Sequence, residues 1–142
     1  MKPSTKETLL KTTLIVTGLV SILLIPIAKV WPSGFVWHGG EGAYYFQMIA
    51  GIYATMGGYM LYAAINPFEP RHRTFLFFVV VVNIVHAVIM GFQAAGDHSE
   101  RGHLIGDVPL LFISSVLIWY LMPARKPESA NDAHAGQIAS PP

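Results

Sequence analysis

The chain contains four apolar stretches, each about as long as a helix that crosses a lipid bilayer. They lie at residues 9–30, 43–65, 75–95 and 104–122. A helix needs roughly 20 mostly apolar residues to span ~30 Å of hydrocarbon. Inside the bilayer every backbone N–H and C=O must be bonded within the protein, which a helix achieves by itself. The pattern therefore predicts an all-α, polytopic membrane protein with four transmembrane helices.

The composition supports this class. The chain is 53% hydrophobic and 12% charged, whereas an ordinary globular domain is about 25% charged. A soluble domain of 142 residues has too much surface for its volume to hide so many apolar side chains. The net charge of +1 gives no reason to expect nucleic acid as a partner. The absence of cysteine excludes disulfide scaffolds, Cys-ligated metal sites and CxxC redox chemistry.

Helix-breaking residues separate the apolar stretches. Pro32, Asn66-Pro67 and Pro123 follow the first, second and fourth stretches, and Asp107 with Pro109 predicts an N-cap and an early helical proline at residue 107. The short connections favour antiparallel neighbours, and so an up-down four-helix bundle over residues 1–122. Residues 123–142 lack apolar periodicity and are predicted to form a disordered polar tail.

The first stretch could be mistaken for a signal peptide, because lysines precede it. The segment Ile27-Ala28-Lys29-Val30-Trp31 offers no clean small-x-small cleavage site, so we expect this stretch to remain in the protein.

Lysine and arginine predict the orientation, since these residues concentrate on the cytoplasmic side. With the N-terminus inside, seven of them are cytoplasmic and two are external. The cytoplasmic ones are Lys2, Lys6, Lys11, Arg71, Arg73, Arg125 and Lys126, and the external ones are Lys29 and Arg101. We therefore expect both termini in the cytoplasm and a location in the bacterial cytoplasmic membrane. The loop at residues 66–73 serves in this scheme as a topology determinant.

Polar residues recur along one face of the third stretch. Asn83, His86, Met90, Gln93 and Asp97 are spaced by 3, 4, 3 and 4 residues, which puts them on one helical face. Polar side chains are costly in hydrocarbon, so this face should point into the bundle.

His86 lies about 14 Å from the outer end of its helix at 1.5 Å per residue, and the other stretches have polar side chains at similar depth. We predict a buried polar layer formed by Ser21, Tyr53, Asn83, His86, Gln93 and Ser114. Two roles for His86 remain open. The imidazole either serves packing as a neutral, hydrogen-bonded group, or it acts as a ligand, proton carrier or quinone contact. A haem would need Met56 or Met60 as the second axial ligand.

The predicted outer loops combine imidazoles and carboxylates, which are ligands for zinc, copper or iron. The candidate metal ligands are His38, Glu41, His98, Glu100 and His103. Their spacing matches no strong motif. We prefer ion pairing of Arg101 with Asp97, Asp107 or Glu41, and we expect no cofactor, with metal, quinone and haem as the alternatives.

Small residues cluster in the second stretch and allow helices to approach closely. They are Ala50, Gly51, Ala54, Gly57 and Gly58. We expect this stretch to be the central packing helix, and a dimer face or a docking surface for a membrane complex is the alternative.

Three enzyme or transporter classes lack their required residues. A small proton-coupled exporter would carry a carboxylate buried deep within a span, whereas the one carboxylate in the four stretches, Asp107, lies near the start of the last stretch. A disulfide-forming oxidoreductase needs cysteine. A Ser/His/Asp hydrolase built on His86 and Asp97 fails, because these two residues are some 16 Å apart along one helix.

A set of short motifs resembles uncharacterised bacterial four-helix membrane proteins of the broad DoxX-like assemblage. The motifs are Gly51-x-Tyr53-x3-Gly57-Gly58-Tyr59-x-Leu61, Asn66-Pro67, Asn83-x2-His86-Ala87-x2-Met90-x2-Gln93 and Arg101-Gly102-His103-Leu104-x-Gly106-Asp107-Val108-Pro109. The resemblance covers roughly residues 10 to 122 and implies the four-helix fold. DoxX itself is associated with a quinol oxidase, but no residue set here carries that role over.

From the sequence we therefore expect a non-catalytic accessory or scaffold subunit of a larger redox or photosynthetic membrane complex. Its partners would be the lipid bilayer and another membrane protein or a second copy of the chain. The alternative is a small metal-, quinone- or haem-associated membrane protein that uses His86 or the outer histidines and glutamates.

Overall fold

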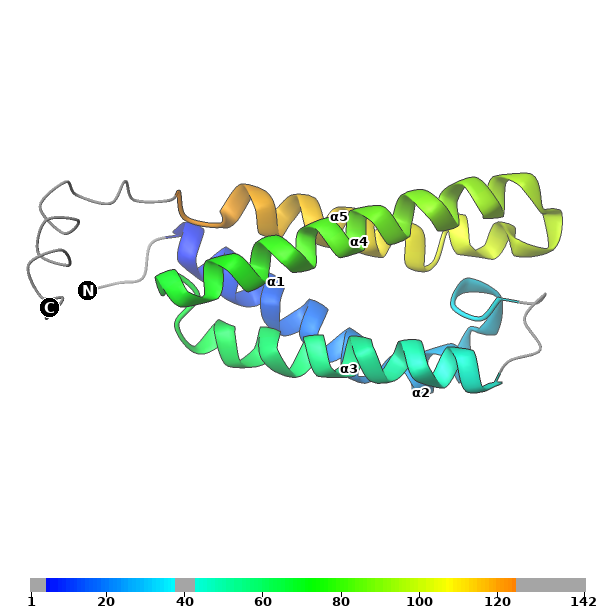
Figure 1. Ribbon diagram of the computed structural model, residues 1–142, viewed down its shortest axis with the longest axis horizontal. Helices are drawn as coiled ribbons and strands as arrows, with labels where there is room; N and C mark the ends of the chain where they lie inside the picture. The colour runs from blue at the N-terminus through cyan, green and yellow to red at the C-terminus, as the bar shows by residue number, and fades with distance from the viewer. Residues whose placement is uncertain (1–4, 38–42, 125–142) are drawn as a thin grey trace, which may run out of the picture.

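The protein is entirely helical over the residues that the computed structural model describes, 5–37 and 43–124. The elements in chain order are α1 (Thr5–Ile22), α2 (Leu24–Val30), η1 (Pro32–Gly34), α3 (Ala43–Ile65), α4 (Pro70–Gly96), η2 (His98–Leu104) and α5 (Asp107–Leu121). Figure 1 shows the long helices side by side along the long axis of the molecule. The predicted disorder of the tail concerns mainly residues 125–142, which lie outside the described residues.

Three helical segments are long and apolar enough to cross a membrane. They are Tyr44–Ile65, Pro70–Gly96 and His98–Leu121, and α1 with α2 provides a fourth if the bent pair is one span. Many large apolar side chains face outward, among them Ile52 and Phe92, which are 59% and 79% exposed. Lipid can cover such a surface and water cannot do so cheaply. The prediction of an all-helical chain with helices able to span a membrane is therefore confirmed.

The stretch expected as one span at 9–30 is two helices that meet at an angle of 69°. Pro26 explains the break. Its nitrogen carries no hydrogen, so it cannot bond the carbonyl of Ile22, and its ring clashes with that carbonyl. Consequently α1 ends at Ile22 and α2 starts after Leu23 in a new direction.

Two other helix starts differ from the expected ones. α4 begins at Pro70, before the expected residue 75, because a proline is well accommodated in the first turn of a helix. Asp107 was expected to cap α5, but Gly106 is the N-cap and Asp107 is the first helical residue. The side chain of Asp107 is therefore available to another partner.

The long helices pack mainly as two pairs, α1 on α3 and α4 on α5. α1 and α3 cross at Gly18 and Gly57. A Cβ atom placed on Gly57 would lie 2.6 Å from the carbonyl oxygen of Gly18, and one on Gly18 would lie 2.9 Å from that of Gly57. Only glycine allows the two backbones to come so close.

The hydrophobic core lies toward the end of the molecule where α1 begins and α5 ends. We call this the basic end, since Lys6, Arg71 and Arg73 lie there. Lys6 Nζ is 5.5 Å from the centre of the Tyr120 ring, and Arg73 Nε donates to the carbonyl of Pro123 over 3.1 Å. The core consists of Leu10, Leu14, Met56, Met60, Ala63, Ala64, Leu76, Val79, Val80, Ile118, Leu121 and Met122. The opposite end, with η1 and η2, we call the 3-10 end.

Candidate functional site

A half-open cavity of about 960 Å³ lies between the helices in the half of the bundle toward the 3-10 end. Valine, isoleucine and leucine side chains supply most of its wall. The polar lining residues are Ser21, Lys29, Gln47, Tyr53, His86, Gln93, His103 and Asp107. A mostly apolar cavity of several hundred Å³ with a few polar groups is typical of a small-molecule site.

The helix geometry explains the hollow. α3 and α4 make few contacts with each other. Because α2 turns away from the line of α1, it covers the side of the cavity and does not fill it, and Leu24, Ile25 and Ala28 form part of the wall.

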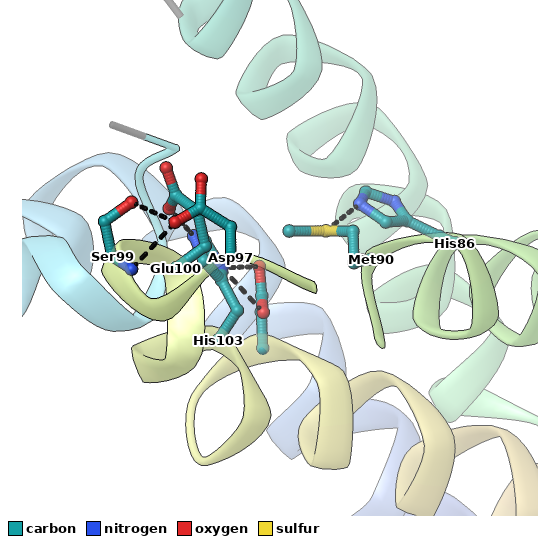
Figure 2. Close-up of polar contacts among 7 residues, drawn as sticks. His86, Met90, Asp97, Ser99, Glu100 and His103 are labelled. Carbon is teal, nitrogen blue, oxygen red and sulfur yellow. Dashed lines mark hydrogen bonds and ion pairs between the residues drawn. The ribbon is translucent and has the colours of Figure 1, made fainter. Parts of the chain in front are cut away.

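A hydrogen-bonded chain of three side chains lies on the cavity wall. Tyr53 Oη of α3 is 2.6 Å from His86 Nδ1 of α4. The other ring nitrogen of His86, Nε2, is 2.7 Å from the sulfur of Met90, one turn further along α4. Figure 2 shows Met90 reaching toward the imidazole. The Tyr53–His86 contact connects α3 to α4 at the cavity wall.

The other members of the predicted polar layer are divided between two environments. Ser21 and Gln93 line the cavity together with Tyr53 and His86, but Gln93 is exposed, so the prediction that it is buried is wrong. Asn83 and Ser114 are buried elsewhere. Ser114 donates to the carbonyl of Leu111 in its own helix, and Asn83 Oδ1 has no hydrogen-bond partner among the described residues.

A second polar group, the His103 cluster, consists of Glu100, His103 and Asp107 at the 3-10 end. His103 Nδ1 is 3.0 Å from each carboxylate oxygen of Asp107, and its Nε2 is 3.5 Å from Glu100 Oε2 (Figure 2). His103 and Glu100 are 0% and 1% exposed. The Trp37 ring lies beside the imidazole, with 5.2 Å between ring centres. Two carboxylates thus flank one buried imidazole, and in a low dielectric such charges are tolerated only when they pair with one another.

The candidate metal ligands are only partly brought together. Glu100 and His103 are adjacent, His98 Nε2 lies 3.3 Å from the guanidinium of Arg101, and His38 and Glu41 lie outside the described residues. Within residues 5–37 and 43–124, no group of three His, Cys, Asp or Glu side chains is arranged to hold a metal ion.

The two described carboxylates of the predicted outer ion pairs, Asp97 and Asp107, each accept hydrogen bonds from neighbouring side chains. Asp97 accepts from the backbone N–H and the hydroxyl of Ser99 over 2.9 and 2.7 Å, which caps η2. Asp107 bonds His103. Ion pairing of Arg101 with Asp97 or Asp107 stays a prediction.

Close backbone contacts join η1 to η2 and bound the 3-10 end. A Cβ atom on Gly102 would overlap the backbone of Ser33, and one on Gly106 would overlap that of Gly34. Glycine at these two positions allows the loop after α2 to lie directly on η2, beside the His103 cluster.

The predicted packing residues of α3 face different ways. Ala50 is buried and Gly57 contacts α1, whereas a Cβ atom on Gly51 or Gly58 would meet nothing within 4 Å in the described part of the chain. Ala54 is half-buried. A role for this face in a dimer or a larger complex stays a prediction.

One buried histidine was not anticipated as a buried residue. His72, assigned to the basic turn, is 1% exposed and lies under an aromatic cluster. Its Nδ1 is 3.3 Å from Tyr59 Oη, its ring centre is 5.2 Å from that of Tyr62, and its Nε2 is 3.7 Å from Glu69. Tyr59 and Tyr62 lie one turn apart near the end of α3, which is the signal that could have revealed this contact.

The model of one protein family, described as a family of unknown function (DUF6632), matches residues 4–135. Neither a curated protein nor a solved structure matches the chain.

Proposed function

The chain belongs to the DUF6632 family of unknown function, and we propose from its geometry that it is a non-catalytic membrane protein that holds a small lipid-soluble molecule. The observation that carries this proposal is the cavity of about 960 Å³. A mostly apolar, half-open hollow of this size is large enough to hold a small lipid-soluble molecule.

The polar lining supports a binding role. Tyr53, His86 and Met90 place hydrogen-bonding atoms at one point of an otherwise apolar wall. A few convergent polar groups in an apolar cavity fix the orientation of a ligand and provide its specificity.

The membrane arrangement that goes with this proposal has four spans in an up-down order, with α1 and α2 as one broken span. The basic end faces the cytoplasm by the positive-inside rule, and both termini lie there. The cavity then opens in the outer half of a bacterial cytoplasmic membrane, where a lipid-soluble molecule can enter from the bilayer.

The role of accessory subunit in a redox or photosynthetic complex stays a prediction, as does the DoxX-like resemblance. Such a role is compatible with a bound lipid-soluble molecule. Mild solubilisation followed by affinity purification tests it: the subunit role requires a larger membrane protein to co-purify in fixed ratio.

The ligand-binding proposal is tested on protein reconstituted in lipid nanodiscs. Native mass spectrometry and organic extraction should find a bound apolar molecule in wild type. Ultraviolet and visible absorption spectra and metal analysis of the same sample identify a quinone, haem or metal. A double variant that fills the cavity, Val85→Phe with Ala28→Leu, should release the molecule.

The matched control is Val88→Phe, which enlarges an exposed side chain of the same helix that does not line the cavity. Occupancy should be unchanged in this control. The proposal is overturned if wild-type protein binds neither a native molecule nor an added apolar probe above the level of empty nanodiscs.

A further inference from the structure

The hydrogen bonds on the cavity wall determine which nitrogen of His86 carries the proton. Tyr53 has a hydroxyl that can donate, and it lies 2.6 Å from Nδ1. The sulfur of Met90 can only accept, and it lies 2.7 Å from Nε2. One tautomer satisfies both contacts: Tyr53 O–H donates to Nδ1, and Nε2–H donates to sulfur. The reverse tautomer would leave an acceptor facing an acceptor at Met90.

The N–H of His86 is therefore paired with a poor acceptor. A thioether sulfur accepts hydrogen bonds weakly compared with a carbonyl oxygen. Met90 is also an unbranched, flexible side chain that can change rotamer at low cost. Both His86 and Met90 line the cavity. A stronger acceptor that enters the cavity can thus take the N–H and displace the sulfur.

We propose that the cavity recognises a neutral, apolar molecule that carries a carbonyl group, and that His86 Nε2–H donates to this oxygen in place of Met90. This rests on the proposed function and specifies its ligand class. Tyr53, His86 and Met90 are neutral groups at one point of the wall, and the His86 N–H is a donor that suits a carbonyl oxygen. Among the described residues, Lys29 of α2 is the one lysine or arginine in the lining. A ketone, ester or quinone fits the point of the wall at His86.

The test compares two probes of the same ring system in nanodiscs, 2-acetylnaphthalene with a carbonyl and 2-ethylnaphthalene without one. Empty nanodiscs correct for partitioning into lipid. Wild-type protein should bind the ketone more tightly, by about threefold to tenfold, which is the usual net value of one hydrogen bond. The carbonyl stretch of a ¹³C-labelled ketone should move to lower wavenumber on binding.

Three variants locate the effect. Met90→Leu conserves volume and removes the competing acceptor, so the preference for the ketone should rise about threefold. His86→Phe should abolish the preference and the infrared shift. Tyr53→Phe removes the donor to Nδ1, so the proton of His86 is no longer held on Nε2. The preference for the ketone should therefore fall. Met48→Leu, an exposed methionine of α3 away from the cavity, is the control and should change nothing.

The two proposals fail in different ways. If neither probe binds above empty nanodiscs, the ligand-binding function itself is wrong. If both probes bind equally, or if Met90→Leu leaves the preference unchanged while the variant retains its thermal stability, the cavity binds apolar molecules but the assignment of a carbonyl ligand to His86 is wrong.

Discussion

At the scale of single residues, two groups of interacting side chains differ in their charge. Tyr53, His86 and Met90 are neutral and make one linear chain of hydrogen bonds. Glu100, His103 and Asp107 bring charges into the interior and depend on one another. Removing a member of the first group loses a hydrogen bond, whereas removing His103 takes away an imidazole that lies between two carboxylates.

His103→Leu should therefore be strongly destabilising. Two carboxylates would lose the imidazole between them, and breaking such a buried arrangement costs ~3 kcal/mol or more. Thermal unfolding in detergent measures the effect. His98→Leu, on the exposed side of the same 3-10 helix, is the control and should shift the midpoint little. Equal midpoint shifts for both variants would show that the His103 cluster stabilises the fold no more than the exposed His98 does.

Asn83→Leu should, in contrast, not lower the stability of the protein. Asn83 is 1% exposed, and its Oδ1 has no hydrogen-bond partner within residues 5–37 and 43–124. Replacing an unsatisfied buried amide with an apolar group of similar size removes a desolvation cost of about 1–3 kcal/mol. The unfolding midpoint should rise or stay level. A clear drop in the midpoint would mean that the Asn83 amide makes a hydrogen bond that stabilises the fold.

The sequence anticipated part of this chemistry. The 3-and-4 spacing along α4 put His86 on an inward face, and equal depth paired it with Tyr53, because helical rise and period are fixed by backbone geometry. The partner of His103 was not foreseen. Asp107 was assigned to a helix cap, and one residue of difference in the helix start turned its side chain to the imidazole. The burial of His72 depends on how α4 packs against the end of α3, which periodicity cannot specify.

At the scale of helices, glycine and proline produce the two departures from a regular bundle. Pro26 bends the first span, and Gly57 brings α1 and α3 together at one crossing point. Their presence was visible in the sequence. The direction of the bend and the partner of each glycine were not, because both depend on neighbouring helices. Gly57 and Gly58 are adjacent in sequence, yet one is packed against α1 and the other faces outward.

Gly57→Ala and Gly58→Ala should therefore have opposite effects on stability. A Cβ atom at position 57 would press on the Gly18 carbonyl at 2.6 Å, which forces α1 away and costs roughly 1–3 kcal/mol. A Cβ atom at position 58 meets nothing within 4 Å in the described part of the chain, so alanine there gains helix propensity of up to about 1 kcal/mol. Unfolding midpoints of the two variants measure this. Similar midpoints would contradict the assigned crossing point.

At the scale of the whole molecule, Lys6, Arg71 and Arg73 lie at one end, and the His103 cluster lies at the other end together with Arg101. The orientation that we propose in the membrane follows from this separation. The chain contains no cysteine, so single cysteines can be introduced without background labelling.

An impermeant maleimide applied to intact cells should label His98→Cys and leave Thr5→Cys and Ala124→Cys unlabelled until the membrane is opened. By the positive-inside rule, Lys6, Arg71 and Arg73 place the basic end on the cytoplasmic side, where the reagent cannot reach positions 5 and 124. Mass-tag gel shifts measure the labelled fraction. Labelling of position 5 or 124 in intact cells would reverse or break the proposed topology.

The hydrophobic core and the cavity occupy opposite halves of the same bundle, and this unequal filling has a consequence for amide exchange. Residues around Met60 and Ile118 are fully enclosed, whereas α2 rests on the rim of a hollow. Local opening takes the least free energy where side chains have the fewest partners. In nanodiscs, the backbone amides of α2 and η1 should therefore exchange with deuterium first, and those at the basic end last. A molecule bound in the cavity should slow exchange in α2 and η1 and leave the exchange rates at the basic end unchanged.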